Sequence, residues 1–167
     1  MTVGIVGLGL ISGSMAKAYS EARHKVLAHN RNKTILDFAM LEGVVSAPLD
    51  DSNLASCDLL LVGLPPEASI HWVETHAHEI DAHTLVMDLC GTKRVVCSAC
   101  FPLAKQYGFT FVGGHPMAGT HNSGFKYARE TLFDGAPMIV VPRVFDDIAL
   151  LERVRRALSP ARFGRIS

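Results

Sequence analysis

The feature that most constrains the fold is a glycine-rich segment close to the amino terminus. It reads Gly7-Leu8-Gly9-Leu10-Ile11-Ser12-Gly13, after an apolar run at residues 3–6 and before residues 14–21, which have apolar side chains at helical spacing. Strand, glycine turn and helix in this order bind a dinucleotide pyrophosphate, because the backbone approaches the phosphates and the helix presents free N–H groups. The expected cofactor contacts are Gly7, Leu8, Gly9, Leu10 and Ile11.

The third position of this fingerprint is Ser12, where glycine or alanine is usual. The helix must pack closely on the strand at this position, so a large side chain would be excluded. Serine is small enough, and we keep the prediction of a dinucleotide-binding turn over that of a glycine turn without a ligand.

The rest of the chain alternates short apolar runs with amphipathic stretches. The runs, at 26–28, 59–62, 85–87, 109–112 and 138–141, predict buried strands, and the stretches at 33–41, 68–79, 93–107 and 146–158 predict helices. This order is typical of a doubly wound, mostly parallel α/β sheet of the Rossmann kind, with ligands at the carboxyl ends of the strands. We expect residues 1–167 to form one dinucleotide-binding domain.

Composition limits the classes of partner. Hydrophobic residues make up 49% of the chain, which fits a sheet buried on both faces. Lysine plus arginine equals aspartate plus glutamate, 16 each, so no net charge favours nucleic acid or an anionic membrane. With no basic leader and no apolar run long enough to cross a membrane, we expect a cytoplasmic protein whose partners are small molecules.

The four cysteines do not predict a metal site or a disulfide framework. Cys97 and Cys100 have the spacing of a redox or zinc pair, but no second such pair exists and both lie in an expected helix; the other two are Cys57 and Cys90. We interpret them as reduced, partly buried thiols, and we expect no bound metal.

The end of the second expected strand bears on the choice of cofactor. An NAD enzyme usually places an acid there to bind the ribose 2′-hydroxyl, and the segment Ala28-His29-Asn30-Arg31-Asn32-Lys33 has none. Asn30 can bind a hydroxyl, while Arg31 and Lys33 can pair with a 2′-phosphate. We expect NADP, with NAD possible; the alternative is that these are ordinary solvated charges.

Three later segments follow expected strands: Gly63-Leu64-Pro65-Pro66, Asp88-Leu89-Cys90-Gly91-Thr92-Lys93 and Gly113-Gly114-His115-Pro116-Met117-Ala118-Gly119-Thr120. With the opening turn they resemble the prephenate and arogenate dehydrogenases of tyrosine biosynthesis. Members typically open with GLGLIGGS, then carry D-x-x-S/G-x-K, and then GGHP-x-AG followed by Ser-Gly, here Ser123-Gly124. The resemblance spans nearly the whole chain but only the amino-terminal half of such enzymes, and we expect their helical dimerisation domain to be absent.

The resemblance implies roles for individual residues. His115 aligns with the catalytic histidine, and a side chain with a near-neutral pKa suits transfer of a hydroxyl proton. Gly91 stands where the family often has a serine that holds the substrate, and His121 stands where many members carry an acid. The implied substrate contacts are Thr92, Thr120 and Ser123, and the further cofactor contacts are Leu64, Pro65, Asp88 and Gly91. Helix capping is the alternative role for Asp88, and a proline-led helix start for Pro65.

The resemblance also implies the reaction. The expected function is NAD(P)-dependent oxidative decarboxylation of prephenate to 4-hydroxyphenylpyruvate by a homodimeric full-length enzyme. The alternatives are an arogenate dehydrogenase and a non-catalytic NADP-binding module. Imine and β-hydroxyacid reductases share the opening turn, but the His-Pro after a double glycine argues against them.

Overall fold

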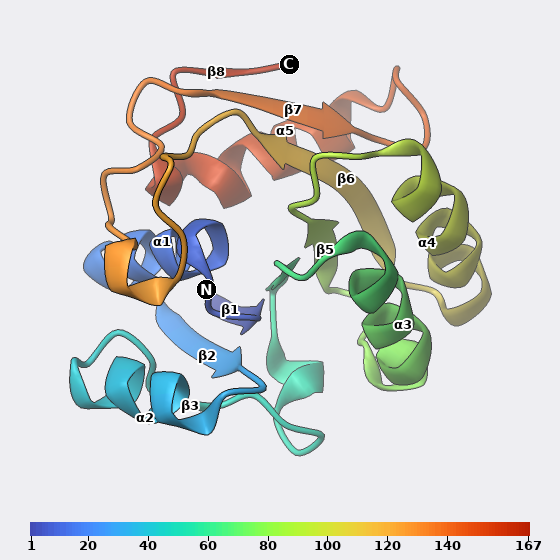
Figure 1. Cartoon of the computed structure of the whole chain (residues 1–167). Helices are drawn as coiled ribbons and strands as arrows, with labels where there is room; N and C mark the ends of the chain where they lie inside the picture. The colour runs from blue at the N-terminus through green and yellow to red at the C-terminus, as the bar shows by residue number, and fades with distance from the viewer.

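The computed structural model describes all 167 residues, Met1–Ser167, and contains one eight-stranded sheet. The strand order is β3-β2-β1-β4-β5-β6-β7-β8 (Figure 1). The strands are β1 (Thr2–Val6), β2 (Lys25–His29), β3 (Ala47–Pro48), β4 (Leu59–Val62), β5 (Leu85–Asp88), β6 (Thr110–Pro116), β7 (Pro137–Val141) and β8 (Arg165–Ile166). The expected doubly wound, Rossmann-like α/β fold is therefore confirmed.

All neighbouring strands pair in parallel except β6 and β7. The first half of β6 pairs with β5, and its second half, from Gly113 to Pro116, pairs with β7 in antiparallel register. The sequence placed the end of this strand at residue 112, which was wrong. Consequently His115 lies on the extended strand opposite Ile139, not on a loop after the strand.

The helices cover both faces of the sheet (Figure 1). They are α1 (Leu10–Glu21), α2 (Lys33–Leu41), α3 (Pro66–His76), α4 (Arg94–Tyr107) and α5 (Ile148–Leu158). Buried side chains of α1, α2 and α5 join one apolar cluster, and those of α3 and α4 join the other. Residues of β4 alternate between the two clusters, with Leu59 and Leu61 in one and Leu60 and Val62 in the other. Burial on both faces explains why the strands appear in the sequence as continuous apolar runs.

Two differences from the expected helices concern the site. The first helix begins at Leu10 rather than at residue 14, so Leu10 and Ile11 belong to its first turn. The fourth begins at Arg94, directly after Lys93. None of the helices has both the length and the apolar character that spanning a bilayer requires.

Candidate dinucleotide and active site

The glycine turn between β1 and α1 has a backbone that only glycine adopts without strain. Gly7 has a φ of +90°, and a Cβ atom there would lie 2.7 Å from the carbonyl oxygen of Gly63. The N–H of Gly7 donates to the carbonyl oxygen of His29. Gly7 thus turns the chain from β1 into α1 while passing between the ends of β2 and β4.

The third fingerprint position packs as the motif requires. Ser12 is buried on α1, and a Cβ atom built on Gly63 would lie 2.5 Å from the Cβ of Ser12. Because Gly63 has no side chain, α1 approaches the sheet although Ser12 is larger than glycine. The Ser12 hydroxyl also accepts a hydrogen bond from the N–H of Gly9 at 3.3 Å.

The outer side of the turn is open. A Cβ atom on Gly9 would meet no atom within 4 Å, and the N–H groups of Leu10 and Ile11 donate to no acceptor in the chain. The turn borders a cavity of about 590 Å³, lined by Gly7, Leu8, Gly9, Asn30, Arg31, Asn32, Ile35, Gly63, Leu64, Gly124 and Phe125. Free N–H groups, the positive end of a helix and open space are the requirements for binding a pyrophosphate.

At the end of β2, the three expected cofactor residues differ in their surroundings. The Asn30 carboxamide accepts from the N–H of Leu8 at 3.0 Å and donates to the carbonyl oxygen of Asn32 at 2.9 Å. Arg31 is exposed, lines the cavity and forms no ion pair. Lys33 is the first residue of α2 and does not line the cavity. Asn30 therefore holds the turn in place. Arg31 is the cation that lines the cavity and can pair with a bound phosphate.

One wall of the cavity comes from Gly124, which belongs to the Ser-Gly motif, and from Phe125, which the sequence did not single out. Gly124 and Phe125, at the start of the short helix η3 (Phe125–Tyr127), face the turn from the connection between β6 and β7. A Cβ atom on Gly13 would lie 2.7 Å from the Phe125 ring, so the ring rests where α1 lacks a side chain. The Ser14 hydroxyl and the Lys17 ammonium group bind the backbone of residues 128–129.

Asp88 and Lys93 form a buried unit next to His115. Asp88 is 1% exposed, and its carboxylate accepts from the Lys93 ammonium group, from the N–H of Cys90 at 3.1 Å and from the N–H of Gly114 at 3.2 Å. Lys93 also donates to the carbonyl oxygen of Gly114 at 2.6 Å. Three donors of the protein thus already bind the Asp88 carboxylate, and its contact with the cofactor stays a prediction.

His115 is half-buried on β6 and faces Gly91. A Cβ atom built on Gly91 would lie 3.6 Å from Nε2 of His115, which is ordinary contact distance. A serine hydroxyl at position 91 would therefore reach the imidazole, and glycine leaves that space free. Thr92, the residue after Gly91, is exposed and lies just before α4.

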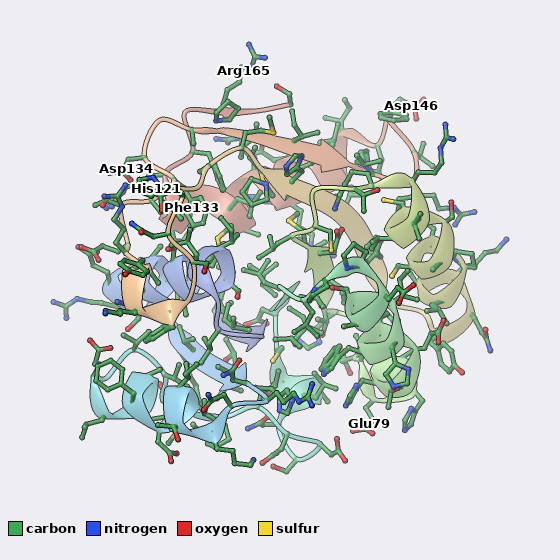
Figure 2. The ribbon with its side chains drawn as sticks, viewed as in Figure 1. Glu79, His121, Phe133, Asp134, Asp146 and Arg165 are labelled. Carbon is green, nitrogen blue, oxygen red and sulfur yellow. The ribbon has the colours of Figure 1, made fainter.

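The other two expected substrate residues lie on the connection that follows β6. Thr120 and Ser123 are exposed, and the Thr120 hydroxyl accepts from the N–H of Asn122 at 3.1 Å. His121 lies on the same connection, as Figure 2 shows. These side chains are exposed, and their contact with a substrate stays a prediction.

Leu64 and Pro65 follow β4. Leu64 lines the cavity, and its carbonyl oxygen accepts from the Ser69 hydroxyl at 2.8 Å and from the Cys90 thiol at 3.3 Å. Pro65 is exposed, caps α3 and does not line the cavity. The helix-start interpretation of Pro65 therefore has direct structural support.

The cysteines are free and buried. Cys97 and Cys100 both lie inside α4, and burial raises the pKa of Cys100 to about 12 and that of Cys57 to about 11. No group of three or more histidine, cysteine, aspartate or glutamate side chains is arranged to hold a metal ion.

Comparison with known proteins gives a consistent result. Residues 15–164 match the family model described as the nucleotide-binding domain of prephenate dehydrogenase. The prephenate dehydrogenase of Bacillus subtilis is 32% identical over 163 residues, which are 94% of this chain and 43% of that protein. The chain therefore spans less than half the length of that relative.

Solved structures share the fold over the full chain. The arogenate dehydrogenase of Synechocystis superposes with a TM-score of 0.88 at 27% identity, covering 100% of this chain and 59% of that one. The prephenate dehydrogenase of Aquifex aeolicus, solved with hydroxyphenyl propionate and NAD⁺, superposes with a TM-score of 0.84 at 24% identity, again covering 100% and 59%. At the latter identity the likeness concerns the fold alone.

Proposed function

Since the chain belongs to the prephenate dehydrogenase family, as its nucleotide-binding domain, we propose that it binds NADP and supplies the catalytic histidine for oxidative decarboxylation of prephenate. The observation that carries the proposal is the pairing of two features at the carboxyl edge of one sheet. The open glycine turn ends β1, and His115 stands beside Gly91 at the end of β5 and β6.

The turn fits a dinucleotide. Gly9 leaves space, and the N–H groups of Leu10 and Ile11 are free to donate to phosphate oxygens. Leu8 and Asn30 brace the turn through their mutual hydrogen bond, so the backbone is held in place before a ligand arrives. A preformed site of this kind loses less conformational entropy on binding.

The chemistry requires a hydride acceptor and a proton acceptor. A nicotinamide held beside the glycine turn would supply the hydride acceptor. The carbon that bears the 4-hydroxyl of the substrate loses the hydride, and the ring carboxylate leaves as carbon dioxide. His115 accepts the hydroxyl proton as the carbonyl develops, and the phenolate left by loss of carbon dioxide takes a proton back to give the phenol of 4-hydroxyphenylpyruvate. The Asp88–Lys93 pair holds both peptide groups that flank the Cα atom of Gly114, and the second of these joins Gly114 to His115. Thr92, Thr120 and Ser123 are the candidate substrate contacts.

The preference for NADP depends on charge. No carboxylate lines the cavity at the end of β2, whereas Arg31 does and is free of ion pairs. A 2′-phosphate accepts charge-assisted hydrogen bonds from a guanidinium group, and a 2′-hydroxyl would gain little from it. Asn30 remains able to border the ribose. The Aquifex aeolicus enzyme was solved in complex with NAD⁺, and NAD is the competing cofactor.

The test is an assay of the full-length protein in which absorbance measures the reduction of NADP⁺ or NAD⁺. Prephenate and arogenate are supplied as separate substrates. We expect turnover of prephenate with NADP⁺, and His115→Asn to lower it by roughly a hundredfold or more with unchanged cofactor affinity. Faster turnover of arogenate would identify the alternative substrate. Cofactor binding without turnover of either compound would leave the non-catalytic binding module as the function.

A further inference from the structure

A second cavity, of about 540 Å³, lies between α1, α2 and η3. Its lining residues are Lys17, Thr34, Ile35, Phe38, Glu42, Gly124, Phe125 and Lys126. Figure 1 shows the orange η3 segment beside α1 and above α2. His115, Gly91 and the glycine turn are not part of this cavity. Its volume lies within the range of roughly 300–1,000 Å³ that is typical of small-molecule sites.

Two aromatic rings form the apolar part of the cavity. Phe38 and Phe125 meet edge to face, with ring centroids 6.5 Å apart and planes at 86°. Phe125 is 4% exposed, whereas Phe38 remains 53% exposed although it is aromatic and sits on a helix that packs against the core. The cavity therefore offers an uncovered aromatic surface, and an incoming ring that packs on it would remove apolar area from water.

Three charged side chains surround this surface, and none of them has an ionic partner in the chain. Lys17, Lys126 and Glu42 form no ion pair. Lys17 is held by the carbonyl oxygen of Ala128 at 2.9 Å, with its ammonium group 4.9 Å from the centre of the Phe125 ring. Lys126 is exposed, and its ammonium group lies 5.6 Å from the centre of the Tyr127 ring. With two cations and one carboxylate, the charged side chains of the cavity have a net charge of +1, which one bound anion would neutralise.

We propose that this cavity binds a small aromatic carboxylate. The aromatic ring packs against Phe38 and Phe125, and the carboxylate pairs with Lys126, the cation that is free to move. The Thr34 hydroxyl is the additional polar group at the α2 side. A neutral aromatic molecule fills the same apolar space but leaves the two lysines unmatched, so charge decides the class of ligand.

The proposal is tested by following backbone amide signals of the isotope-labelled chain during titration with sodium phenylacetate, with benzyl alcohol as the neutral counterpart. We expect saturable shifts at Thr34, Phe38, Gly124 and Lys126, and binding of benzyl alcohol weaker by about fivefold or more. Equal binding of the two probes would overturn the assignment of a carboxylate. Shifts at Gly91 and His115 without shifts in the cavity would show that phenylacetate occupies the proposed active site instead.

Two substitutions at exposed positions locate the site. Phe38→Ala and Lys126→Gln should each raise the phenylacetate dissociation constant by about tenfold while the amide spectrum stays that of the folded chain. The matched controls are Phe145→Ala and Lys105→Gln, which alter exposed residues outside the cavity and should leave the constant unchanged. Figure 2 shows Asp146, the neighbour of Phe145, far from the η3 side of the molecule.

The proposal fails if both cavity variants bind phenylacetate as the unaltered chain does. It also fails if the cavity amides shift with protein concentration in the absence of phenylacetate, because a second copy of the chain would then cover this surface.

Discussion

Asp88 and Lys93 form a buried ion pair that holds one residue, Gly114, by both its N–H and its carbonyl oxygen. The side chain of Lys93 is 15% exposed and that of Asp88 is 1% exposed. A pair this well buried contributes little net free energy, but removing one partner leaves an isolated buried charge. The pair therefore links the start of α4 to the strand that carries His115.

Loss of one partner should destabilise the domain strongly. Lys93→Met leaves the Asp88 carboxylate unpaired and should lower the free energy of unfolding by about 3–5 kcal/mol. Adding Asp88→Asn should recover most of this loss, because the buried site becomes neutral again. Urea unfolding of both variants measures the effect, with Lys105→Met on the exposed side of the same helix as the control. Additive losses in the double variant would show that the two residues do not act as a pair.

Substitution of the two glycines of the turn should have different effects, one on cofactor binding and the other on stability. Gly9→Val places a side chain in the open space of the turn and should abolish cofactor binding while leaving the thermal midpoint nearly unchanged. Gly7→Val should destabilise the fold itself, since φ is +90° and the carbonyl oxygen of Gly63 blocks a Cβ atom. Calorimetric titration with NADP⁺ and thermal unfolding separate the outcomes. Full affinity in Gly9→Val would place the pyrophosphate elsewhere.

Arg31 should discriminate between the two dinucleotides. Arg31→Ala should weaken NADP⁺ by about tenfold or more and change NAD⁺ little, because only NADP⁺ has the 2′-phosphate. Lys33→Ala should have a smaller effect, since Lys33 does not line the cavity. Arg143→Ala, at an exposed position elsewhere, is the control. Equal losses for both dinucleotides would assign Arg31 to the pyrophosphate or to the adenine end.

Position 91 should tolerate a hydroxyl that reaches His115. Gly91→Ser places its Cβ atom 3.6 Å from Nε2 of His115 without overlap, so the hydroxyl can form a hydrogen bond to the ring. The ¹⁵N signals of the His115 ring should shift in this variant and stay in place in Gly91→Ala. Identical spectra for the two variants would mean that the imidazole faces away from residue 91 in solution.

The thiols should react slowly in the folded chain. Burial raises the pKa of Cys57 to about 11 and that of Cys100 to about 12, and it also raises those of Cys90 and Cys97. A pH of 8 lies below the pKa of all four thiols, and the thiolate fraction of Cys57 is then about one in a thousand. A disulfide reagent should label none of them rapidly until denaturant is added. Fast labelling of Cys97 and Cys100 in the native chain would favour the hypothesis that they form a redox pair.

Patterns set by neighbouring residues could be predicted from the sequence. The runs at 3–6 and 59–62 gave β1 and β4, because burial on both faces excludes polar residues from a parallel strand. The extension of β6 was missed because its partner, β7, lies more than 20 residues further along the chain. The two-residue strand β3 carries too little periodicity to be recognised.

Side-chain partners in the site depend on contacts between distant segments. Asn30 has the chemistry to bind a ribose, but nothing in the sequence tells that its carboxamide meets the N–H of Leu8. Asp88 ends a strand in the manner of a ligand-binding acid, and only the fold brings Gly114 to it. The role of Phe125 was equally inaccessible, because it depends on a helix more than 100 residues earlier in the chain.

The ring of Phe125 belongs to two cavities at once, since it lines both the dinucleotide cavity and the cavity between α1, α2 and η3. Any molecule that fixes or displaces the ring from one side changes the surface offered on the other. If occupancy of one cavity changes the affinity of the other, reciprocity requires the opposite effect to have the same factor. The Phe125 ring packed at Gly13 is the contact through which two ligands of this domain would be coupled.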